Sequence, residues 1–426
     1  MALHPELVKR SLSAHSVTGL TVGVFMYLIC LTGSLVALAE AFERWEQPEI
    51  EEFQTAAPHA IATAMSQFRI EVESSPDSLW VVFPTPELPR MHVTDGETER
   101  FTRADGRLDT APFERWTHML RELHIQLHLP QTIGMGLVSA IGAILIGLIV
   151  SGLFAHPRLF KDAFQLRLGG SRRLEQADIH NRLSVWALPF HLMIALTGAF
   201  YGLVGVLAFS AATAWYGGDT NALFDDVYGS DPVLTQQAST LNTTEAMKQL
   251  KARHPNVSPI YIVAHKLDSD AQFMEIAATV PGRLAYSEIY RFNAQGHYLG
   301  SQELTTGPVG RQLLYSLYRI HFGYFGGQWT RIIWFFLGLA LTIVSVTGIN
   351  VWLAKRNLDD IVDRAWLGFV WATPLALTVS ATASLFTSLT PLPIFLLVVT
   401  VPIFVSIKTA TMKTYRQWIL ITNAAA

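Results

Sequence analysis

Residues 129–155 read LPQTIGMGLVSAIGAILIGLIVSGLFA and contain no Lys, Arg, Asp or Glu. A helix needs roughly 20 predominantly apolar residues to cross a bilayer, so this stretch predicts a transmembrane helix. Four further charge-free stretches have the same character, and they span residues 11–39, 183–218, 332–354 and 366–407. The last one contains Pro391 and Pro393, which should divide it into two helices. The sequence therefore predicts six transmembrane helices.

The composition of the whole chain agrees with a membrane protein. Half of the 426 residues are apolar and 15% are charged, whereas a soluble protein carries about 25% charged residues. The net charge is -3 and no long basic run occurs, which argues against a nucleic-acid partner. The single cysteine, Cys30, excludes an internal disulfide and any Cys-rich iron–sulfur or zinc site.

Lys and Arg residues beside the apolar stretches indicate the orientation of the chain. They precede the first stretch, separate the second from the third, and follow the fourth and the last. All four basic segments lie on one side of the membrane if both termini are cytoplasmic. The predicted transmembrane helices are 11–39, 121–156, 179–216, 316–354, 366–389 and 391–407, the loop 157–178 is cytoplasmic, and the segments 40–120 and 217–315 are external.

The two external segments predict similar small α+β modules. Each begins with a helical pattern, near 59–68 in the first segment and at 243–253 in the second. Alternating apolar residues then predict strands near 79–83, 90–93 and 99–101, and near 259–264, 272–279, 287–292 and 297–300. Gly106 and Gly296 mark turns at matching places in the two segments.

The odd-numbered spans share a pattern of histidine and glycine. His15 precedes Gly33 by 18 residues in the first span, and His180 precedes Gly198 by 18 residues in the third. Eighteen residues make five helical turns, so each histidine and its glycine share one face of the helix.

The even-numbered spans repeat a second pattern. His124 precedes Gly152 by 28 residues, and His321 precedes Gly348 by 27. A unit of span, external module and span therefore occurs twice, in parallel orientation about an axis along the membrane normal. The glycines could be no more than close packing points between helices, but that reading does not explain histidines at matched depths.

Seven of the fourteen histidines lie in or beside the spans. The inner layer, on the cytoplasmic side, consists of His15, His156, His180 and His191, and the outer layer consists of His124, His128 and His321. Ionisable residues near a bilayer are costly and point to function. Neutral imidazoles between helices are common axial ligands of b-type haem. Zinc, copper or a proton relay would favour carboxylates, cysteines or many methionines, and the charge-free stretches contain no carboxylate.

The sequence therefore predicts two or more b-type haems, each held non-covalently by two histidines. In the inner layer we expect His180 to ligate iron with His15, or alternatively with His156 or His191. In the outer layer we expect His321 with His124, or alternatively with His128.

Sequence spacing adds two expectations about these residues. His124 and His128 share a helical face if their segment is helical, as do His180 and His191. Arg121 and Arg319 flank the outer histidines and are predicted to pair with haem propionates.

Four motifs resemble the PepSY-associated transmembrane proteins. They are Leu123-His-Ile-Gln-Leu-His-Leu-Pro130, Ser151-Gly-Leu-Phe-Ala-His-Pro-Arg158, Asp178-Ile-His-Asn181 with Leu188-Pro-Phe-His through Thr197-Gly198, and Ile320-His-Phe-Gly with Gly326-Gly327, Arg331, Gly338-Leu, Val346-Thr-Gly348 and Trp352. The resemblance covers about residues 10–356, so the last two spans lie outside it. It implies a bacterial inner-membrane protein with two periplasmic PepSY-like modules.

Members of that family include haem-containing ferric-siderophore reductases. The resemblance thus implies an oxidoreductase that passes electrons from a quinol or a cytoplasmic reductase to a periplasmic ferric siderophore. Two alternatives remain open from the sequence: a siderophore or iron transporter, and a regulatory membrane protein whose modules bind peptides or proteases without redox activity. Neither alternative requires haem.

Overall fold

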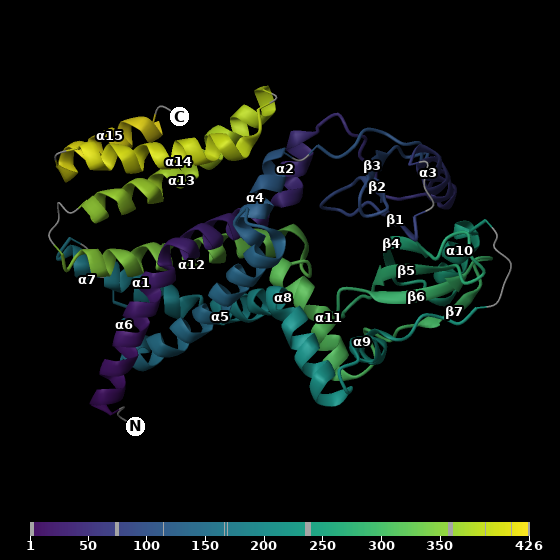
Figure 1. Cartoon of the computed structure of the whole chain (residues 1–426), viewed down its shortest axis with the longest axis horizontal. Helices are drawn as coiled ribbons and strands as arrows, with labels where there is room; N and C mark the ends of the chain where they lie inside the picture. Colours follow the sequence, from purple (N-terminus) through teal and green to yellow (C-terminus); the bar gives the residue numbers. More distant parts are fainter. Residues whose placement is uncertain are drawn as a thin grey trace. The chain divides into compact units, whose positions relative to one another are not determined.

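The chain divides into two compact units in the computed structural model (Figure 1). The structure describes residues 4–72, 76–113, 115–165, 167, 169–234, 240–356, 361–387, 389–409 and 411–424. The helical unit comprises Met1–Ala39, Glu114–Val204 and Ile332–Ala426, and the sheet unit comprises Glu40–Phe113 and Gly205–Arg331.

Long apolar helices dominate the helical unit. Its elements are α1 (Pro5–Val36), α4 (Arg115–Gln126), α5 (Gln131–Ala155), α6 (Leu159–Asp162), α7 (Arg172–Trp186), α8 (Leu188–Trp215), α12 (Gly327–Leu353), α13 (Ile361–Phe386), α14 (Pro391–Lys408) and α15 (Met412–Ala424). Helices α8 and α12 extend a short way into the sheet unit.

Five of these helices, α1, α5, α8, α12 and α13, are long and apolar enough to cross a membrane. The chain is therefore a multi-pass membrane protein. The predicted sixth span corresponds to α14, whose apolar part Pro391–Ser406 is shorter than the other five. Proline separates α13 from α14 as the sequence predicts, because Pro391 occupies the first turn of α14, where it costs no hydrogen bond.

Three of the predicted spans begin with a separate short helix, which corrects their predicted continuity. Leu127 and His128 adopt left-handed backbone angles, with φ of 55° and 52°, between α4 and α5. The prediction that His124 and His128 share a helical face is therefore wrong. Leu129 precedes Pro130, a position that disfavours helix.

Similar breaks occur in the second half of the chain. The helix α7 ends at Trp186, and α8 begins at Leu188 with Pro189 in its first turn. The helix α11 (Val309–Phe322) ends at Gly323, which has a φ of 73°. The outer-layer residues His124 and His321 thus both lie near the carboxyl end of a short helix that precedes a span.

The sheet unit contains one antiparallel sheet of seven strands in the order β3-β2-β1-β4-β5-β6-β7. The strands are β1 (Ser78–Val82), β2 (Met91–Thr94), β3 (Glu99–Thr102), β4 (Ser258–His265), β5 (Phe273–Thr279), β6 (Glu288–Asn293) and β7 (Tyr298–Ser301). The sequence predicts these strands within a few residues, but it treats the two modules as separate. Pairing of β1 with β4 joins them, so neither strand is left as an open edge.

Two helices cover one face of this sheet. The helices of the sheet unit are α2 (Ala39–Glu46), α3 (Pro58–Glu71), α9 (Thr220–Tyr228), α10 (Thr243–Arg253) and α11. Apolar residues of α3 and α10 form one core with strand residues of both modules, including Phe68, Leu79, Leu250 and Phe292. The opposite face of the sheet carries the polar side chains described below.

The turn glycines show that the two modules are built alike. Gly106 and Gly296 both have a φ of 86°, an angle that favours glycine. A Cβ on Gly106 would collide with the backbone of Ala60 in α3, and one on Gly296 would lie 2.7 Å from the backbone nitrogen of Ala246 in α10. Each turn therefore packs directly against the helix of its own module.

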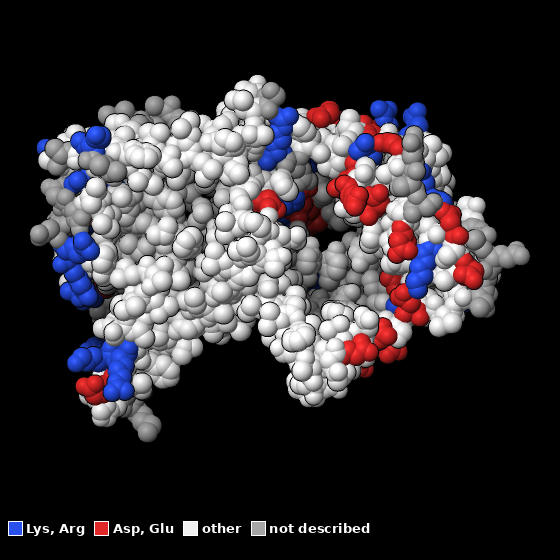
Figure 2. All heavy atoms as spheres, in the orientation of Figure 1, with Lys and Arg blue, Asp and Glu red and all other residues white. Residues whose placement is uncertain are grey.

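The two units differ in charge. The sheet unit contains 25 Asp and Glu against 15 Lys and Arg, whereas the helical unit contains 9 against 16. Figure 2 shows the acidic side chains gathered over the sheet unit. This division agrees with the few charges that the membrane-spanning helices contain.

Candidate functional site: histidines hydrogen-bonded to helix backbone

His15 on α1 lies against α5 at a glycine. Its Nδ1 lies 2.9 Å from the backbone oxygen of Leu148 and 3.3 Å from the hydroxyl of Ser151. A Cβ on Gly152 would come within 3.3 Å of the imidazole Cε1. The missing side chain of Gly152 thus leaves the space that the His15 ring occupies.

His180 on α7 makes the same contact with α12. Its Nδ1 lies 3.0 Å from the backbone oxygen of Val344 and 3.4 Å from the hydroxyl of Thr347. A Cβ on Gly348 would again come within 3.3 Å of the imidazole Cε1.

His124 on α4 repeats the contact against α1. Its Nδ1 lies 2.9 Å from the backbone oxygen of Ile29, and a Cβ on Gly33 would lie 2.7 Å from that Nδ1. In all three contacts the carbonyl belongs to the residue four positions before the glycine, which places both on one helix face. Gly33, Gly152 and Gly348, which from the sequence could have been helix-packing points alone, are therefore the positions against which the imidazoles lie.

These contacts fix the tautomer of each imidazole. A backbone carbonyl can only accept a hydrogen bond, so Nδ1 of His15, His124 and His180 must carry the proton. In a neutral imidazole Nε2 is then the unprotonated nitrogen, and this is the form of the ring that binds a metal. Hydrogen bonds of this kind to the second ring nitrogen orient metal-ligating histidines in proteins.

His15 and His180 are brought together from different halves of the repeat. Their ring centroids are 6.2 Å apart and the ring planes are inclined by 83°. This is one of the inner-layer pairings that the sequence left open.

The other inner-layer histidines occupy different surroundings. His191 is 2% exposed, bonds the backbone of Leu337 on α12, and has an enclosed Nε2 with no hydrogen-bond partner among the described residues. His156 ends α5 and lies 3.7 Å from the carboxylate of Asp162. Neither ring is in the arrangement that His15 and His180 share.

Two more predicted site residues have structural contacts. His128 donates from Nε2 to the backbone oxygen of Met119, at 3.0 Å, in the turn after α4. Arg319 donates to the backbone oxygens of Tyr324 and Arg283, both at 2.7 Å, and so holds the chain that follows α11. Arg121 lies in α4, three residues before His124.

His321 lies in α11 of the sheet unit, whereas the other six predicted histidines belong to the helical unit. Its ring packs edge to face on Phe322, with centroids 5.3 Å apart. Within the described residues, no three His, Cys, Asp or Glu side chains form a group that could hold a metal ion.

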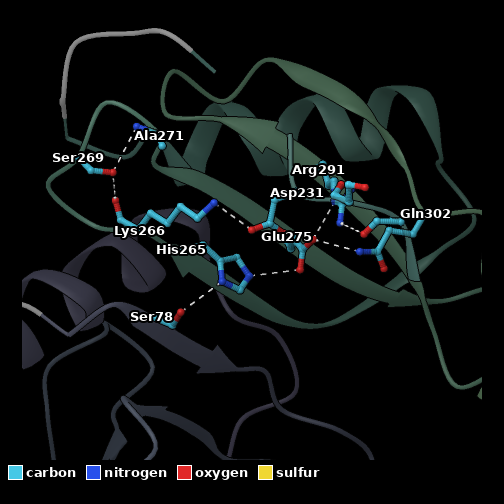
Figure 3. Close-up of polar contacts among 11 residues, drawn as sticks. Ser78, Asp231, His265, Lys266, Ser269, Ala271, Glu275, Arg291 and Gln302 are labelled. Carbon is cyan, nitrogen blue, oxygen red and sulfur yellow. Dashed lines mark hydrogen bonds and ion pairs between the residues drawn. The ribbon is translucent and has the colours of Figure 1, made fainter. Parts of the chain in front are cut away.

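The sheet unit contains a polar cluster that the sequence did not reveal (Figure 3). His265 on β4 connects Ser78 on β1, 3.2 Å from its Nδ1, to Glu275 on β5, 3.2 Å from its Nε2. Glu275 also accepts from Arg291 at 2.8 Å and from Gln302 at 3.3 Å. Ser78 and His265 are direct partners across β1 and β4, so the cluster spans the joint between the modules.

Electrostatics in this cluster stabilise the charged carboxylate. Burial by itself raises the pKa of Glu275, but the hydrogen bonds from His265 and Arg291 outweigh it and hold the pKa below its ordinary value. The alternation of β4, β5 and β6 places these side chains on the face opposite the helices, a signal that strand predictions alone could have used.

A second buried ion pair was also missed. Arg331 pairs with Glu40, and Tyr324 donates its hydroxyl to the same carboxylate. Glu40 directly follows the first charge-free stretch and Arg331 directly precedes the fourth. Charges directly beside the first and fourth charge-free stretches were the available signal.

Comparison with known proteins identifies the family. The model described as the PepSY-associated TM region matches residues 12–355, so the helices α13, α14 and α15 lie outside the match. An uncharacterized protein of Pseudomonas aeruginosa is 26% identical over 236 residues, which are 52% of this chain and 60% of that protein. The chain thus spans less than two thirds of that relative. On the strength of the family match, this chain belongs to the PepSY-associated transmembrane family.

Proposed function

We propose that this protein is a haem-containing oxidoreductase of a bacterial inner membrane that reduces a periplasmic ferric siderophore from Fe(III) to Fe(II). The observation that carries the proposal is the repeated contact of His15, His124 and His180. Each imidazole donates from Nδ1 to a helix carbonyl, the kind of hydrogen bond that orients metal-ligating histidines.

The separation of His15 and His180 supports haem ligation. A metal–imidazole nitrogen bond is about 2 Å long, so two imidazoles this close together could both be held by one haem. The observed separation is 6.2 Å. Both ligands would be imidazoles, one from α1 and one from α7, which suits haem iron better than zinc, for which carboxylates and thiolates are common ligands.

The remaining predicted ligands receive different support. His124 shares the tautomer of the inner pair, and we propose it and His321 each as an outer-layer ligand. His191 is a weaker candidate because its Nε2 is enclosed by protein, and His128 is weaker because its Nε2 already donates to a carbonyl. Arg121 and Arg319 remain proposed partners of propionates.

The bound haems would accept and give up single electrons. The chain itself would hold the imidazoles between its helices, with one layer proposed near each edge of the membrane. Electrons would enter from a quinol or a cytoplasmic reductase and leave at the outer layer. Ferric siderophores hold Fe(III) through hard oxygen donors, which hold Fe(II) far less well, so one-electron reduction is a direct route to iron release.

The proposed topology has six spans, with α14 as the sixth and both termini in the cytoplasm. Reporter fusions at Gly170 and Gly217 should then report opposite sides of the membrane, because α7 and α8 between them make up one predicted span and therefore one crossing. Fusions that report one side would contradict the repeat on which the two histidine layers depend.

A spectroscopic and kinetic experiment tests the function. Purified protein should show the low-spin spectrum of bis-imidazole haem in the oxidised and the dithionite-reduced state. A ferric siderophore should reoxidise the reduced protein, with Fe(II) trapped by a ferrous chelator. A protein that lacks haem yet binds or transports ferric siderophores would be a transporter, and one that does neither would fit the regulatory alternative.

A further inference from the structure

The helix α13 lies outside the family match but packs along the helices that carry the candidate ligands. Near its start, Asp363 lies 3.6 Å from Arg172 of α7, the helix of His180. Near its end, Ser380 accepts a hydrogen bond at 3.2 Å from the indole of Trp116, which belongs to α4, the helix of His124. The appended segment therefore contacts the helices of both histidine layers.

Trp366 makes the central contacts of α13. It is 7% exposed, and its indole nitrogen donates to the side-chain oxygen of Asn350 on α12, at 3.0 Å. Its ring packs edge to face against Tyr27 of α1, with centroids 5.9 Å apart. Tyr27 in turn donates its hydroxyl to the backbone oxygen of Val370, at 2.7 Å. One side chain thus contacts both α1, which carries His15, and α12, against which the ring of His180 packs.

The hydrogen bond from Trp366 continues to the helix of His180. Asn350 follows Gly348 by two residues, and its amide donates to the side chain of Gln176 on α7, at 2.9 Å. Gln176 precedes His180 by four residues, which is about one helical turn. The two hydrogen bonds that link Trp366, Asn350 and Gln176 therefore lie about one helical turn from the place where His180 contacts α12.

We propose that Trp366 is a positioning residue for the His15–His180 pair, an inference that rests on the proposed function. Helices in lipid gain little from apolar contacts with one another, so polar and close-packed contacts set their spacing. Ligand pairs need their helices held within about 0.5 Å. Trp366 fixes α12 by its hydrogen bond and α1 by its ring, and so sets the distance between the two imidazoles.

The test uses the full-length haem-loaded protein with substitutions at two tryptophans of α13. Trp366→Phe keeps an aromatic ring but loses the hydrogen bond, and Trp366→Leu loses both. Trp371→Leu is the matched control, because Trp371 lies on the same helix and is 47% exposed. The measurements are the low-spin resonance signal of the haem iron and the rate of haem transfer to apomyoglobin.

Trp366→Phe should lose inner-layer haem about fivefold faster, the factor that one hydrogen bond of ~1 kcal/mol gives. Trp366→Leu should lose it faster still and convert part of the low-spin signal to high-spin, while Trp371→Leu matches the wild type. Wild-type protein without haem would overturn the proposed function together with this inference. Haem loss and resonance signals in both Trp366 variants equal to those of Trp371→Leu would overturn the inference alone. If Trp366→Leu does not accumulate, Trp366→Phe and Asn350→Leu decide by the same measurements.

Discussion

The two halves of the helical unit place their inner-layer histidines by the same contact, although they build it on unlike helices. His15 lies within a helix of 32 residues, whereas His180 lies in α7, which ends at Trp186 before α8 begins. Both rings nevertheless lie against a glycine, Gly152 or Gly348, at the same approach of 3.3 Å to an added Cβ. The repeat preserves the position of an imidazole on its partner helix rather than the continuity of the helix that carries it.

The two modules of the sheet unit show the reverse: they share the backbone arrangement, but the side chains at matched positions interact differently. Counting five residues back from each turn glycine gives Phe101 in β3 and Arg291 in β6. Their cross-strand partners are His92 and Glu275. The first pair packs edge to face at 6.3 Å, whereas the second forms an ion pair at 2.8 Å. The ion pair at this matched position is thus found in the second module alone.

Removing an inner-layer imidazole should have the largest effect and tests whether the halves are equivalent. His15→Ala and His180→Ala should each abolish the low-spin signal of the inner haem, because either change leaves iron with one imidazole. His156→Ala is the matched control, since its ring lies beside Asp162, and it should keep the signal. Optical and resonance spectra of the purified variants measure the outcome. A full inner-haem signal in either His15→Ala or His180→Ala would break the equivalence.

Alanine at the glycines that face the imidazoles should have the next largest effect. In Gly33→Ala the new methyl group would collide with the ring of His124, a kind of overpacking that costs roughly 1–3 kcal/mol. We expect a perturbed outer haem in this variant. Gly152→Ala and Gly348→Ala should have smaller effects of equal size.

The control for these variants is Gly136→Ala on α5, because no described heavy atom beyond its chain neighbours and the adjacent backbone of its own helix lies within 4 Å of its added Cβ. Haem content and redox titration compare the four proteins. Unequal effects at Gly152 and Gly348 would show that the two inner contacts differ in packing.

The sequence predicted elements well where the signal is local. Charge-free stretches located the five long helices, and alternation located all seven strands. The joining of the modules could not be predicted, because the pairing of Ser78 with His265 connects residues far apart in the chain. The histidines were predicted as a group from their depth, but the choice of His15 over His191 as the neighbour of His180 depends on how α1 packs on its partners. The role of Gly152 and Gly348 likewise required the partner helix.

Loss of the ion pair in the second module should have a moderate effect on stability. Glu275→Gln removes the carboxylate that faces Arg291 and His265, and Arg291 is 13% exposed. Leaving a largely buried charge without its partner costs roughly 3 kcal/mol, so the thermal unfolding temperature of the sheet unit should fall. His92→Gln, at the equivalent place in the first module, should lower the thermal unfolding temperature less at pH 7.5. A larger loss of stability in His92→Gln would contradict the stabilising role assigned to the Arg291–Glu275 ion pair of the second module.

The smallest effect concerns pH and the first module. Burial lowers the pKa of His92 to about 4, against about 6.5 in an unfolded chain, and the facing carboxylate of Glu99, 3.3 Å away, has its own pKa raised by burial. As pH falls from 6.5 towards 4, the unfolded state binds a proton that the folded state does not, so stability falls with pH. Linkage gives a loss of roughly 1 kcal/mol between pH 7 and pH 5.5. Hydrogen exchange of the β2 and β3 amides should show this loss of stability in the wild type. The control His297→Gln, which changes an exposed histidine, should show the same loss, whereas His92→Gln should not. Equal pH dependence in all three proteins would mean that His92 is not the group responsible.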